Sequence, residues 1–314
     1  MAPDRNTTQE SPMKLRQLEA FRAVVRNGTT AAAAHELGVS QPNVSNLVRH
    51  MEDQIGFELF SRRSGRLVPT AEAERIYQDI EPVFSMLKGV EQRIKDLRDS
   101  SAGSLRIVAT PSMASSIVGH SLKRFLDKWP RIKVTLDIRR MENLIEQIQT
   151  RQSEIGVALS FEEHPSIHTE AIHEGTFVAV LAKTHPLASE PVITPRLLQG
   201  HRVISLERGT PLGSKIARAF KASQEHYDWS LETRYGYTAC SMAGMGIGVA
   251  LVDEYIARAT EFAHLKCRPF KPAVPVVAYM VYSRETPLSR IAQNYSRIVR
   301  DVIAERAVAF GASS

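Results

Sequence analysis

Long apolar runs are absent from this sequence of 314 residues, and its first residues lack the pattern of a secretory leader. No apolar stretch approaches the roughly 20 residues that a helix needs to cross a bilayer, and the opening MAPDRNTTQESPMK is polar. We therefore expect no membrane partner and a cytoplasmic location. Hydrophobic residues make up 43% of the chain and charged residues 24%, which excludes disorder throughout and allows two or three domains.

Cysteine is also scarce. The two cysteines, Cys240 and Cys267, lie far apart in apolar contexts and lack the paired spacing that metal or redox sites need, so both are interpreted as buried small hydrophobes. The ten histidines are scattered, and the nearest pair at helical spacing, His164 and His168, has Pro165 between its members. We expect no metal and no cofactor.

Catalytic motifs are missing as well, since the sequence contains no nucleophile elbow, phosphate loop or metal cluster. The nearest approach to a glycine-rich loop, Gly244-Met-Gly246-Ile-Gly248, precedes an expected strand instead of linking a strand to a helix. We interpret these glycines as close backbone packing. The sequence therefore predicts no catalytic residues and no enzyme, although an enzyme built on the α/β region stays as an alternative.

The balance of charge permits a nucleic-acid partner without demonstrating one. The net charge is +6, and many basic proteins bind no nucleic acid. The distribution is more informative, because Arg62, Arg63 and Arg66 fall within the short segment Ser61–Arg66, where no acidic residue offsets them.

Three short helices are expected near the amino terminus. Apolar residues recur every three to four positions between Leu15 and Val25, and a second, alanine-rich helix, TAAAAHEL, follows Thr29 as its cap. A third helix starts after Ser40, with Pro42 tolerated in its first turn. Its period predicts a buried face made of Val44, Leu47, Val48, Met51 and Ile55, and an opposite polar face made of Pro42, Ser45, Asn46, Arg49 and Asp53, with Gln41 at the leading end.

A wing and a long helix are expected next. The runs Phe57–Phe60 and Gly65–Val68 flank the arginine-rich segment and predict a small two-stranded wing. After Pro69-Thr70, apolar residues recur at steps of four and three, at Ile76, Ile80, Val83, Leu87, Val90, Ile94 and Leu97. This heptad pattern favours a dimerisation helix, while a surface helix packed on its own domain is the alternative; Pro82 should bend or interrupt it.

The remainder of the chain predicts an α/β fold. After the linker Asp99–Ser104, strands alternate with helices, which indicates an open sheet of parallel strands with crossover helices. The expected strands are 105–109, 133–138, 155–159, 177–181, 203–206, 231–233, 248–252 and 276–281, and a helix over 289–304 follows.

These patterns divide the chain into a series of parts. The predicted parts are a flexible tail (1–12), a winged helix-turn-helix (13–70), a linker helix (71–100), a hinge (101–104), an effector-binding domain (105–305) and a second tail (306–314). Within the effector domain we expect one subdomain from 105–162 with 268–305, and another from 163–267.

The segment from Lys14 to Thr70 resembles the DNA-binding domain of LysR-type regulators, and the resemblance continues to about Glu305. It rests on LRQLEAFRAV, TTAAAAHELGVSQPNVS, GFELFSRRSGRLVPT and SLRIVATPS, in that order. Pro69-Thr70, Glu72-Ala73 and Arg268-Pro-Phe270 are similar to LysR itself and to the regulators of opine catabolism. The resemblance implies a winged helix-turn-helix, a long dimerisation helix, and two Rossmann-like α/β subdomains like those of periplasmic binding proteins.

The resemblance also implies where DNA binds. It places Ser40, Gln41, Pro42 and Ser45 at groove-reading positions, and glutamine or asparagine can contact adenine while arginine favours guanine. The wing arginines should meet phosphates or the minor groove. Asn46 stands where relatives often carry arginine. The full set of expected DNA-binding residues is Thr29, Ser40, Gln41, Pro42, Asn43, Ser45, Asn46, Arg49, Arg62, Arg63 and Arg66.

An effector site is expected at the strand ends. In open α/β sheets, ligands settle beyond the carboxyl ends of strands, where helix amino termini offer N–H groups to anions. Three polar turns follow strands in this way and supply the candidate residues Thr110, Ser112, Ser115, Ser116, Thr210, Pro211, Tyr235, Tyr237 and Thr238. Helix capping is the alternative role for each of their hydroxyls.

The ligand class and the partners follow from the resemblance. Opine and lysine-related regulators carry an acidic residue at the position of Leu159, and its absence favours a small carboxylate-bearing metabolite, with amino-acid derivatives also possible. The expected partners are double-stranded operator DNA, this effector, a second copy or three further copies of the chain, and RNA polymerase. Activation and repression both remain open. A solute-binding protein for transport is a further alternative, although it would need an export signal.

Overall fold

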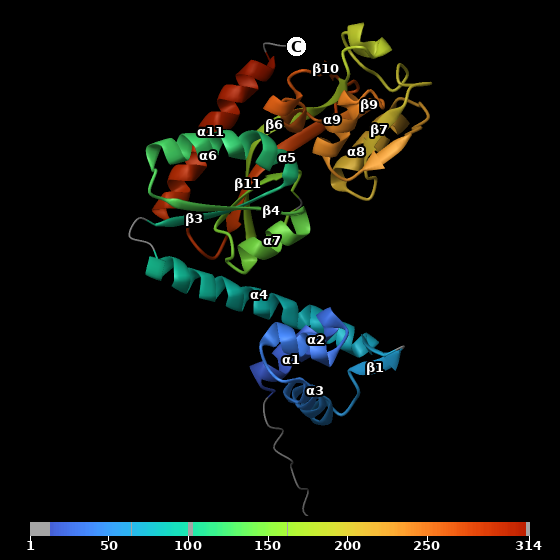
Figure 1. Cartoon of the computed structure of the whole chain (residues 1–314). Coiled ribbons are helices and arrows are strands. Elements are labelled where there is room, and N and C mark those ends of the chain that lie inside the picture. The colour runs from blue at the N-terminus through green and yellow to red at the C-terminus, as the bar shows by residue number, and fades with distance from the viewer. Residues whose placement is uncertain (1–12, 64, 100–102, 162, 312–314) are drawn as a thin grey trace, which may run out of the picture. The chain divides into compact units, whose positions relative to one another are not determined.

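A computed structural model describes all residues except 1–12, 64, 100–102, 162 and 312–314 (Figure 1). The predicted amino-terminal tail and most of the predicted hinge therefore lie outside the described residues. The chain forms two compact units, which meet in sequence between Lys88 and Gly89. We call the first the winged unit and the second the effector unit, and describe each by itself.

Three helices and a hairpin build the winged unit. They are α1 (Leu15–Asn27), α2 (Thr30–Leu37), α3 (Gln41–Ile55), β1 (Phe60–Arg63) and β2 (Arg66–Pro69). Each of the three helices ends at a glycine in the left-handed region, as Gly38 does between α2 and α3 with φ of 65°. A side chain is strained in that region, so the glycine permits the sharp turn between the helices.

The buried face of α3 matches the predicted one. Val44, Val48 and Met51 are fully or almost fully buried, and Leu47 and Ile55 pack against the same core. The core continues through α1 to the wing, where the rings of Phe21 and Phe60 lie with centroids 5.6 Å apart.

The position of the wing strands differs from the predicted one. We expected strands at the runs Phe57–Phe60 and Gly65–Val68. In the structure Arg62 and Arg63 belong to β1, whereas Arg66 begins β2 within the second run, and Arg63 is paired opposite Arg66 in an antiparallel register. The strands start about three residues later than predicted at the first run because Phe57 and Glu58 form the turn after α3.

The long helix α4 (Ala71–Asp99) is continuous, so the expectation that Pro82 might interrupt it is wrong. Its heptad pattern divides into two parts. Ile76 and Ile80 pack into the core of the winged unit, as the alternative interpretation held. Farther along, four apolar side chains are exposed, namely Val83, Met86, Val90 and Ile94, the last with 61% of its surface accessible. The side chain of Leu97 lies outside the described residues.

Nine strands form one sheet in the described part of the effector unit (Figure 1). The strands are β3 (Ser104–Ala109), β4 (Lys133–Ile138), β5 (Ile155–Leu159), β6 (Ile167–Leu181), β7 (Val203–Leu206), β8 (Leu231–Thr233), β9 (Val249–Asp253), β10 (Lys266–Pro269) and β11 (Pro275–Ser283). Their order is β4-β3-β5-β11-β6-β9-β7-β8, with β10 also paired to β6. At one end β3 is parallel to β4 and β5, and at the other β7 is parallel to β8 and β9.

The centre of this sheet corrects two expectations. The predicted sheet was wholly parallel, but β6, β10 and β11 pair antiparallel with their neighbours. The predicted strand 177–181 is only the end of β6, whose residues 167–176 pair with β11 and whose later residues pair with β9 and β10. The first ten residues of β6 are mostly polar and, apart from Ile167, are half-buried or exposed, so this part lacks the apolar run from which we predicted strands. The division after residue 162 therefore ignores a strand that both halves share.

Helices follow the strand ends. They are α5 (Pro111–Met113), a π-helical turn (Ala114–Val118), α6 (Gly119–Lys128), α7 (Met141–Gln149), α8 (Pro211–Ala222), α9 (Gly236–Gly244), α10 (Glu254–Ala257) and α11 (Arg290–Gly311), with short 3₁₀ turns at Pro186–Ser189 and Thr260–Phe262. The helix α11 packs beside α6, where Phe125 meets Tyr295 edge to face. It also runs to Gly311, so the predicted tail from residue 306 is wrong as far as that residue.

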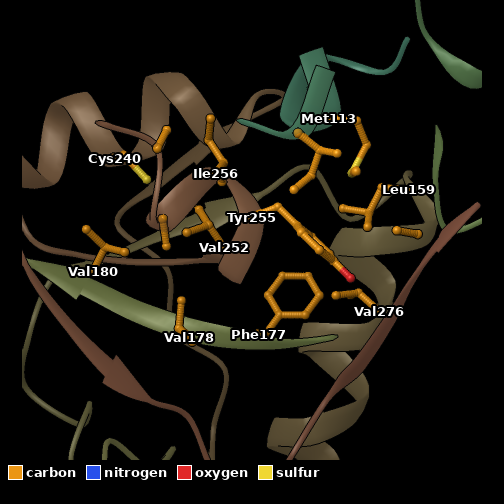
Figure 2. Close-up of a cluster of buried hydrophobic side chains, with 14 of the residues drawn as sticks. Met113, Leu159, Phe177, Val178, Val180, Cys240, Val252, Tyr255, Ile256 and Val276 are labelled. Carbon is orange, nitrogen blue, oxygen red and sulfur yellow. The ribbon is translucent and has the colours of Figure 1, made fainter. Parts of the chain in front are cut away.

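The core of the effector unit joins several elements. Figure 2 shows its centre, where Met113 of α5, Phe177 of β6, Tyr255 of α10 and Val276 of β11 come together. Cys240 is fully buried there and Cys267 is half-buried, and burial raises the pKa of both thiols. Gly248 is packed closely, since a β-carbon there would lie 2.3 Å from the carbonyl oxygen of Arg202.

None of the helices that the described residues form is long and apolar enough to span a bilayer. Within the same residues, no three histidine, cysteine or acidic side chains gather as a metal site would require.

Candidate DNA-reading helix and ligand cleft

The exposed face of α3 carries the polar residues that the sequence singled out. Ser40 precedes the helix, and its hydroxyl makes no capping bond. Gln41, Pro42, Asn43, Asn46 and Arg49 are exposed and Ser45 is half-buried. One exposed face of α3 therefore carries amide, hydroxyl and guanidinium groups.

Gln41 has a neighbour that the sequence did not suggest. Its Nε2 donates a hydrogen bond to Oγ1 of Thr30, over 3.2 Å, which ties the start of α3 to the start of α2. Thr29, an expected DNA-binding residue, uses its Oγ1 to accept from the backbone N–H of Ala32 and so caps α2. Thr30 positions Gln41, and only the folded turn brings the two together.

The other side of α3 is fixed to the rest of the winged unit. Gln17 Nε2 donates to Gln54 Oε1 over 2.6 Å, and the backbone N–H of Leu59 donates to Glu52 Oε1 over 2.7 Å. These bonds, together with the buried apolar face, hold the helix between α1 and the wing. A reading helix has to be held in this way to present its side chains in one orientation.

The wing extends the polar surface of the unit. Arg62 and Arg66 are exposed, and neither forms an ion pair with a carboxylate among the described residues. The side chain of Arg63 lies outside the described residues. The backbone N–H of Leu67 donates to the carbonyl of Gly28 over 2.9 Å, which anchors the hairpin to the turn after α1.

A cleft of about 190 Å³ opens in the effector unit where four helices begin. Its walls come from the starts of α5, α7, α8 and α9 and from the end of β5. The lining residues are Thr110, Pro111, Ser112, Arg140, Met141, Glu142, Leu159, Ser160, Leu206, Gly209, Thr210, Pro211, Leu212, Arg234, Tyr235 and Gly236. Helix amino termini carry partial positive charge, so their convergence favours an anion.

Five of the nine expected effector residues line this cleft, and the hydroxyls of the serine and the two threonines among them already have protein partners. Ser112 Oγ donates to Asp253 Oδ2 over 2.8 Å, and Thr110 Oγ1 accepts from the backbone N–H of Leu159. Thr210 Oγ1 caps α8 by accepting from Gly213 N and donates to the carbonyl of Glu207. Pro211 and Tyr235 complete the set.

The other four expected effector residues lie outside the cleft. Ser115 is exposed, and Ser116 is buried with its hydroxyl donating to the carbonyl of Ser112 over 2.6 Å. The ring of Tyr237 packs edge to face on Phe262, and Thr238 is half-buried within α9. A π-helical turn follows α5, and it rotates Ser115 and Ser116 away from the lining residues.

Two arginines of the cleft were not expected. Arg234 follows β8 and pairs with Glu207, whose carboxyl pKa is lowered by the hydrogen bond from Arg234 and by the charges of Arg234 and Arg140. Arg140 is exposed and precedes α7, and it forms no ion pair among the described residues. Arg234 comes directly after a predicted strand and Arg140 comes two residues after another, and this is the sequence signal that we did not use.

Comparison with known proteins identifies both units. The sequence matches a family described as "Bacterial regulatory helix-turn-helix protein, lysR family" over residues 15–74 and one described as "LysR substrate binding domain" over residues 98–304. Among curated proteins it is similar to the octopine catabolism/uptake operon regulatory protein OccR of Rhizobium meliloti, with 32% identity over 82% of this chain and 85% of that one.

Two further likenesses extend over nearly the whole chain. The regulatory protein NocR of Agrobacterium fabrum is 26% identical over 92% of this chain and 96% of its own, and the transcriptional activator LysR of Escherichia coli is 29% identical over 90% and 91%. The crystal structure of CbnR, 19% identical, aligns with a TM-score of 0.70 over 92% of this chain and 99% of that one, which shows a common fold.

These matches confirm the predicted fold and the prediction of a regulator in place of an enzyme. The two family matches together cover both units, and the relatives are named as regulators. The chain belongs to the LysR-type family of bacterial transcriptional regulators.

Proposed function

We propose that this regulator reads double-stranded operator DNA with α3 in the major groove and with the wing on the phosphate backbone. The exposed polar face of α3 carries the proposal, because Gln41 projects from its start and is backed by a rigid apolar face. An α-helix fits the major groove, and amide side chains there distinguish adenine. A crystal structure of full-length CbnR complexed with its target DNA shares the fold of this chain, which supports DNA as the partner of the winged unit.

Binding of cognate and random DNA by two variants tests this assignment. Gln41→Ala should weaken binding to the cognate operator by roughly 1–3 kcal/mol and leave binding to random DNA unchanged. Arg62→Gln should weaken both alike and reduce the salt dependence. Arg75→Gln, which removes an exposed cation from α4, serves as the charge control. Equal losses on both DNAs in the Gln41 variant would contradict base reading.

The effector in this proposal is a small metabolite that carries a carboxylate. Four helix amino termini and the unpaired Arg140 surround the cleft, and Glu142 is the acidic residue among the described lining residues. A volume of about 190 Å³ is below the ~300–1,000 Å³ of pockets for drug-sized molecules, which favours a small ligand. OccR is named for octopine catabolism, so amino-acid derivatives belong to the candidate class.

Thermal-shift screening of organic and amino acids tests the effector class. A true ligand at 100 times its Kd should add about 2.7 kcal/mol of stability. Arg140→Gln should then lower the affinity about tenfold or more, because it removes a charged donor. The neighbouring Arg139, which pairs with Asp137 over 2.9 Å and does not line the cleft, provides the matched control Arg139→Gln. Equal ligand affinity in Arg140→Gln and Arg139→Gln would mean that the effector binds outside this cleft.

The proposal also includes self-association and a role at the promoter. The exposed apolar residues of α4, Val83, Met86, Val90 and Ile94, are covered by the same helix of a second copy, and paired dimers form tetramers. Ile94→Glu should shift the sedimentation of the protein toward smaller species. The bound regulator acts on RNA polymerase, as the family resemblance implies, and a reporter gene measured with and without effector distinguishes activation from repression.

A further inference from the structure

A second cavity of about 300 Å³ adjoins the cleft in the effector unit. Ser160 and Pro211 line both cavities, so the two meet at these residues. The other lining residues are Phe161, Ser214, Lys215, Arg218, Val277 and Tyr279. They come from the segment after β5, from α8 and from β11, none of which the predicted effector set included apart from Pro211.

The charge of this second cavity is of one sign. Lys215 and Arg218 are three residues apart on α8, which places two cations on one face of a helix, and none of the described lining residues is acidic. Lys215 is half-buried, and its Nζ donates to the carbonyl of Pro275 over 2.8 Å. Burial and the charge of Arg218 lower the pKa of Lys215, while Glu174, which does not line the cavity, acts in the opposite direction.

Neither cation of the second cavity has a carboxylate partner among the described residues. Arg218 is exposed and forms no ion pair with any described residue. Two like charges in this position oppose each other, and an anion bound between them would relieve the repulsion. Such an anion would also meet apolar walls, because Phe161 and Tyr279 lie with ring centroids 6.3 Å apart.

The boundary between the two cavities holds an unsatisfied group. Ser160 Oγ is buried and has no hydrogen-bond partner among the described residues, which is costly for a hydroxyl. The backbone of Ser160 adopts a left-handed conformation with φ of 58°, and its N–H donates to the carbonyl of Val277 over 2.8 Å. This conformation is uncommon for a residue other than glycine, and it fixes the hydroxyl where both cavities meet.

We propose that the second cavity binds a second carboxylate of the effector, so that the ligand is a dicarboxylate that spans both cavities. The first carboxylate lies at the helix amino termini and Arg140, and the second lies between Lys215 and Arg218. The connecting part of the ligand passes Ser160, whose hydroxyl gains a partner there. This inference rests on the proposed function of the cleft and adds the number and placement of the anionic groups.

Calorimetry with straight-chain dicarboxylates of increasing length, each compared with its own monoamide, tests the inference. The monoamide keeps the length and removes one charge. At least one dicarboxylate should bind the full-length protein about tenfold or more tightly than its monoamide. Arg218→Gln and Lys215→Met should each reduce this ratio toward one, because each weakens binding of the dicarboxylate more than binding of the monoamide. Lys221→Met, an exposed position near the end of α8 outside the cavity, should keep the full ratio.

The outcomes separate the two proposals. A ratio near one in the wild-type protein at every length, or a ratio that survives both variants, would overturn the second site. Arg218 is exposed, so its variant tests the proposal even if Lys215→Met fails to fold. The affinity of Arg140→Gln for the monoamide tests the first cleft independently. If this variant bound the monoamide as tightly as the wild type, the proposed effector site in the first cleft would be overturned.

Discussion

The helix α3 and the ligand cleft use their polar residues in opposite ways. On α3 most of the expected side chains are exposed and Ser45 is half-buried, and among the described residues their one side-chain partner is Thr30, which Gln41 contacts. In the cleft, Thr110, Ser112 and Thr210 are already bonded to other parts of the protein. A serine or threonine after a strand thus serves the fold first, by capping a helix or fixing a neighbour. Arginines and backbone N–H groups are then left to meet a ligand.

The largest expected effect tests whether the two units are independent. Phe21→Ala in the winged unit and Phe125→Ala in the effector unit each remove a fully buried ring and should cost about 3–5 kcal/mol of unfolding free energy. Each loss should be confined to its own unit, as hydrogen exchange resolved by segment would show. Loss of protection in both units from either substitution would mean that they unfold together.

A smaller effect tests whether the cleft hydroxyls are structural. Ser112→Ala leaves Asp253 Oδ2 without its donor, and this carboxyl is fully buried. Burial raises the pKa of Asp253 even though Ile256 N–H and Ser112 Oγ act to lower it. We expect a loss of roughly 1–3 kcal/mol without ligand, measured by urea unfolding. Ser115→Ala, on the exposed side, should change stability by less than about 0.5 kcal/mol.

An ion pair in each unit offers a comparison by pH. Arg22 and Glu81 form a two-bond pair of 2.6 and 3.1 Å; burial alone would raise the pKa of Glu81, but the bonds from Arg22 and Tyr77 lower it. Glu81→Gln should cost about 1 kcal/mol in the winged unit near neutral pH. Because the folded pKa is lowered, this stabilisation is present above the ordinary value of 4.5 and is lost as the pH falls through the folded value.

The corresponding pair in the effector unit is the control. Arg300 and Glu170 also share two bonds, both of 2.7 Å, and the hydrogen bond from Arg300 lowers the pKa of Glu170. Glu170→Gln should act on the effector unit alone, and by less, because both side chains are more exposed. Acid titration of wild type and variants, followed by segment-resolved exchange, separates the two. A Glu81 effect that persisted at low pH would contradict its electrostatic origin.

The smallest expected effect compares two hydroxyls at helix starts in the winged unit. Thr29 Oγ1 accepts from Ala32 N, so Thr29→Ala should cost about 1 kcal/mol. Ser40 Oγ makes no such bond, and Ser40→Ala should cost less than about 0.5 kcal/mol. Chemical denaturation measures both. If Ser40→Ala proved the more costly of the two, the hydroxyl of Ser40 would have to act as a cap in solution.

Local patterns of the sequence were sufficient for the three helices of the winged unit. The buried face of α3 follows from a period of 3.6 residues, which depends only on neighbours along one helix, and Val44, Val48 and Met51 are buried as expected. In the effector unit, strands that are buried throughout, such as 155–159 and 203–206, begin and end where predicted. These strands are covered by helices and consist mostly of apolar residues, so the sequence alone predicts their burial.

The remainder depends on contacts between distant segments. The polar half of β6 becomes a strand because β11 pairs with it, and no run of apolar residues in the sequence predicts this pairing. Arg140 and Arg234 are about ninety residues apart and line one cleft only after the sheet has formed. The buried hydroxyl of Ser160, which has no hydrogen-bond partner among the described residues, likewise depends on a left-handed backbone conformation that the neighbouring sequence does not predict.

The strand β6 has a mechanical consequence for signalling. It crosses from one half of the sheet to the other, and the chain returns through residues 270–274. The two crossings are hydrogen-bonded to each other, since the N–H of Phe177 donates to the carbonyl of Val274 over 3.0 Å. The halves are therefore coupled by a continuous ladder and not by loose tethers. If the proposed effector draws the two halves together, it has to twist this hydrogen-bonded ladder, because the strands and not flexible loops connect the halves.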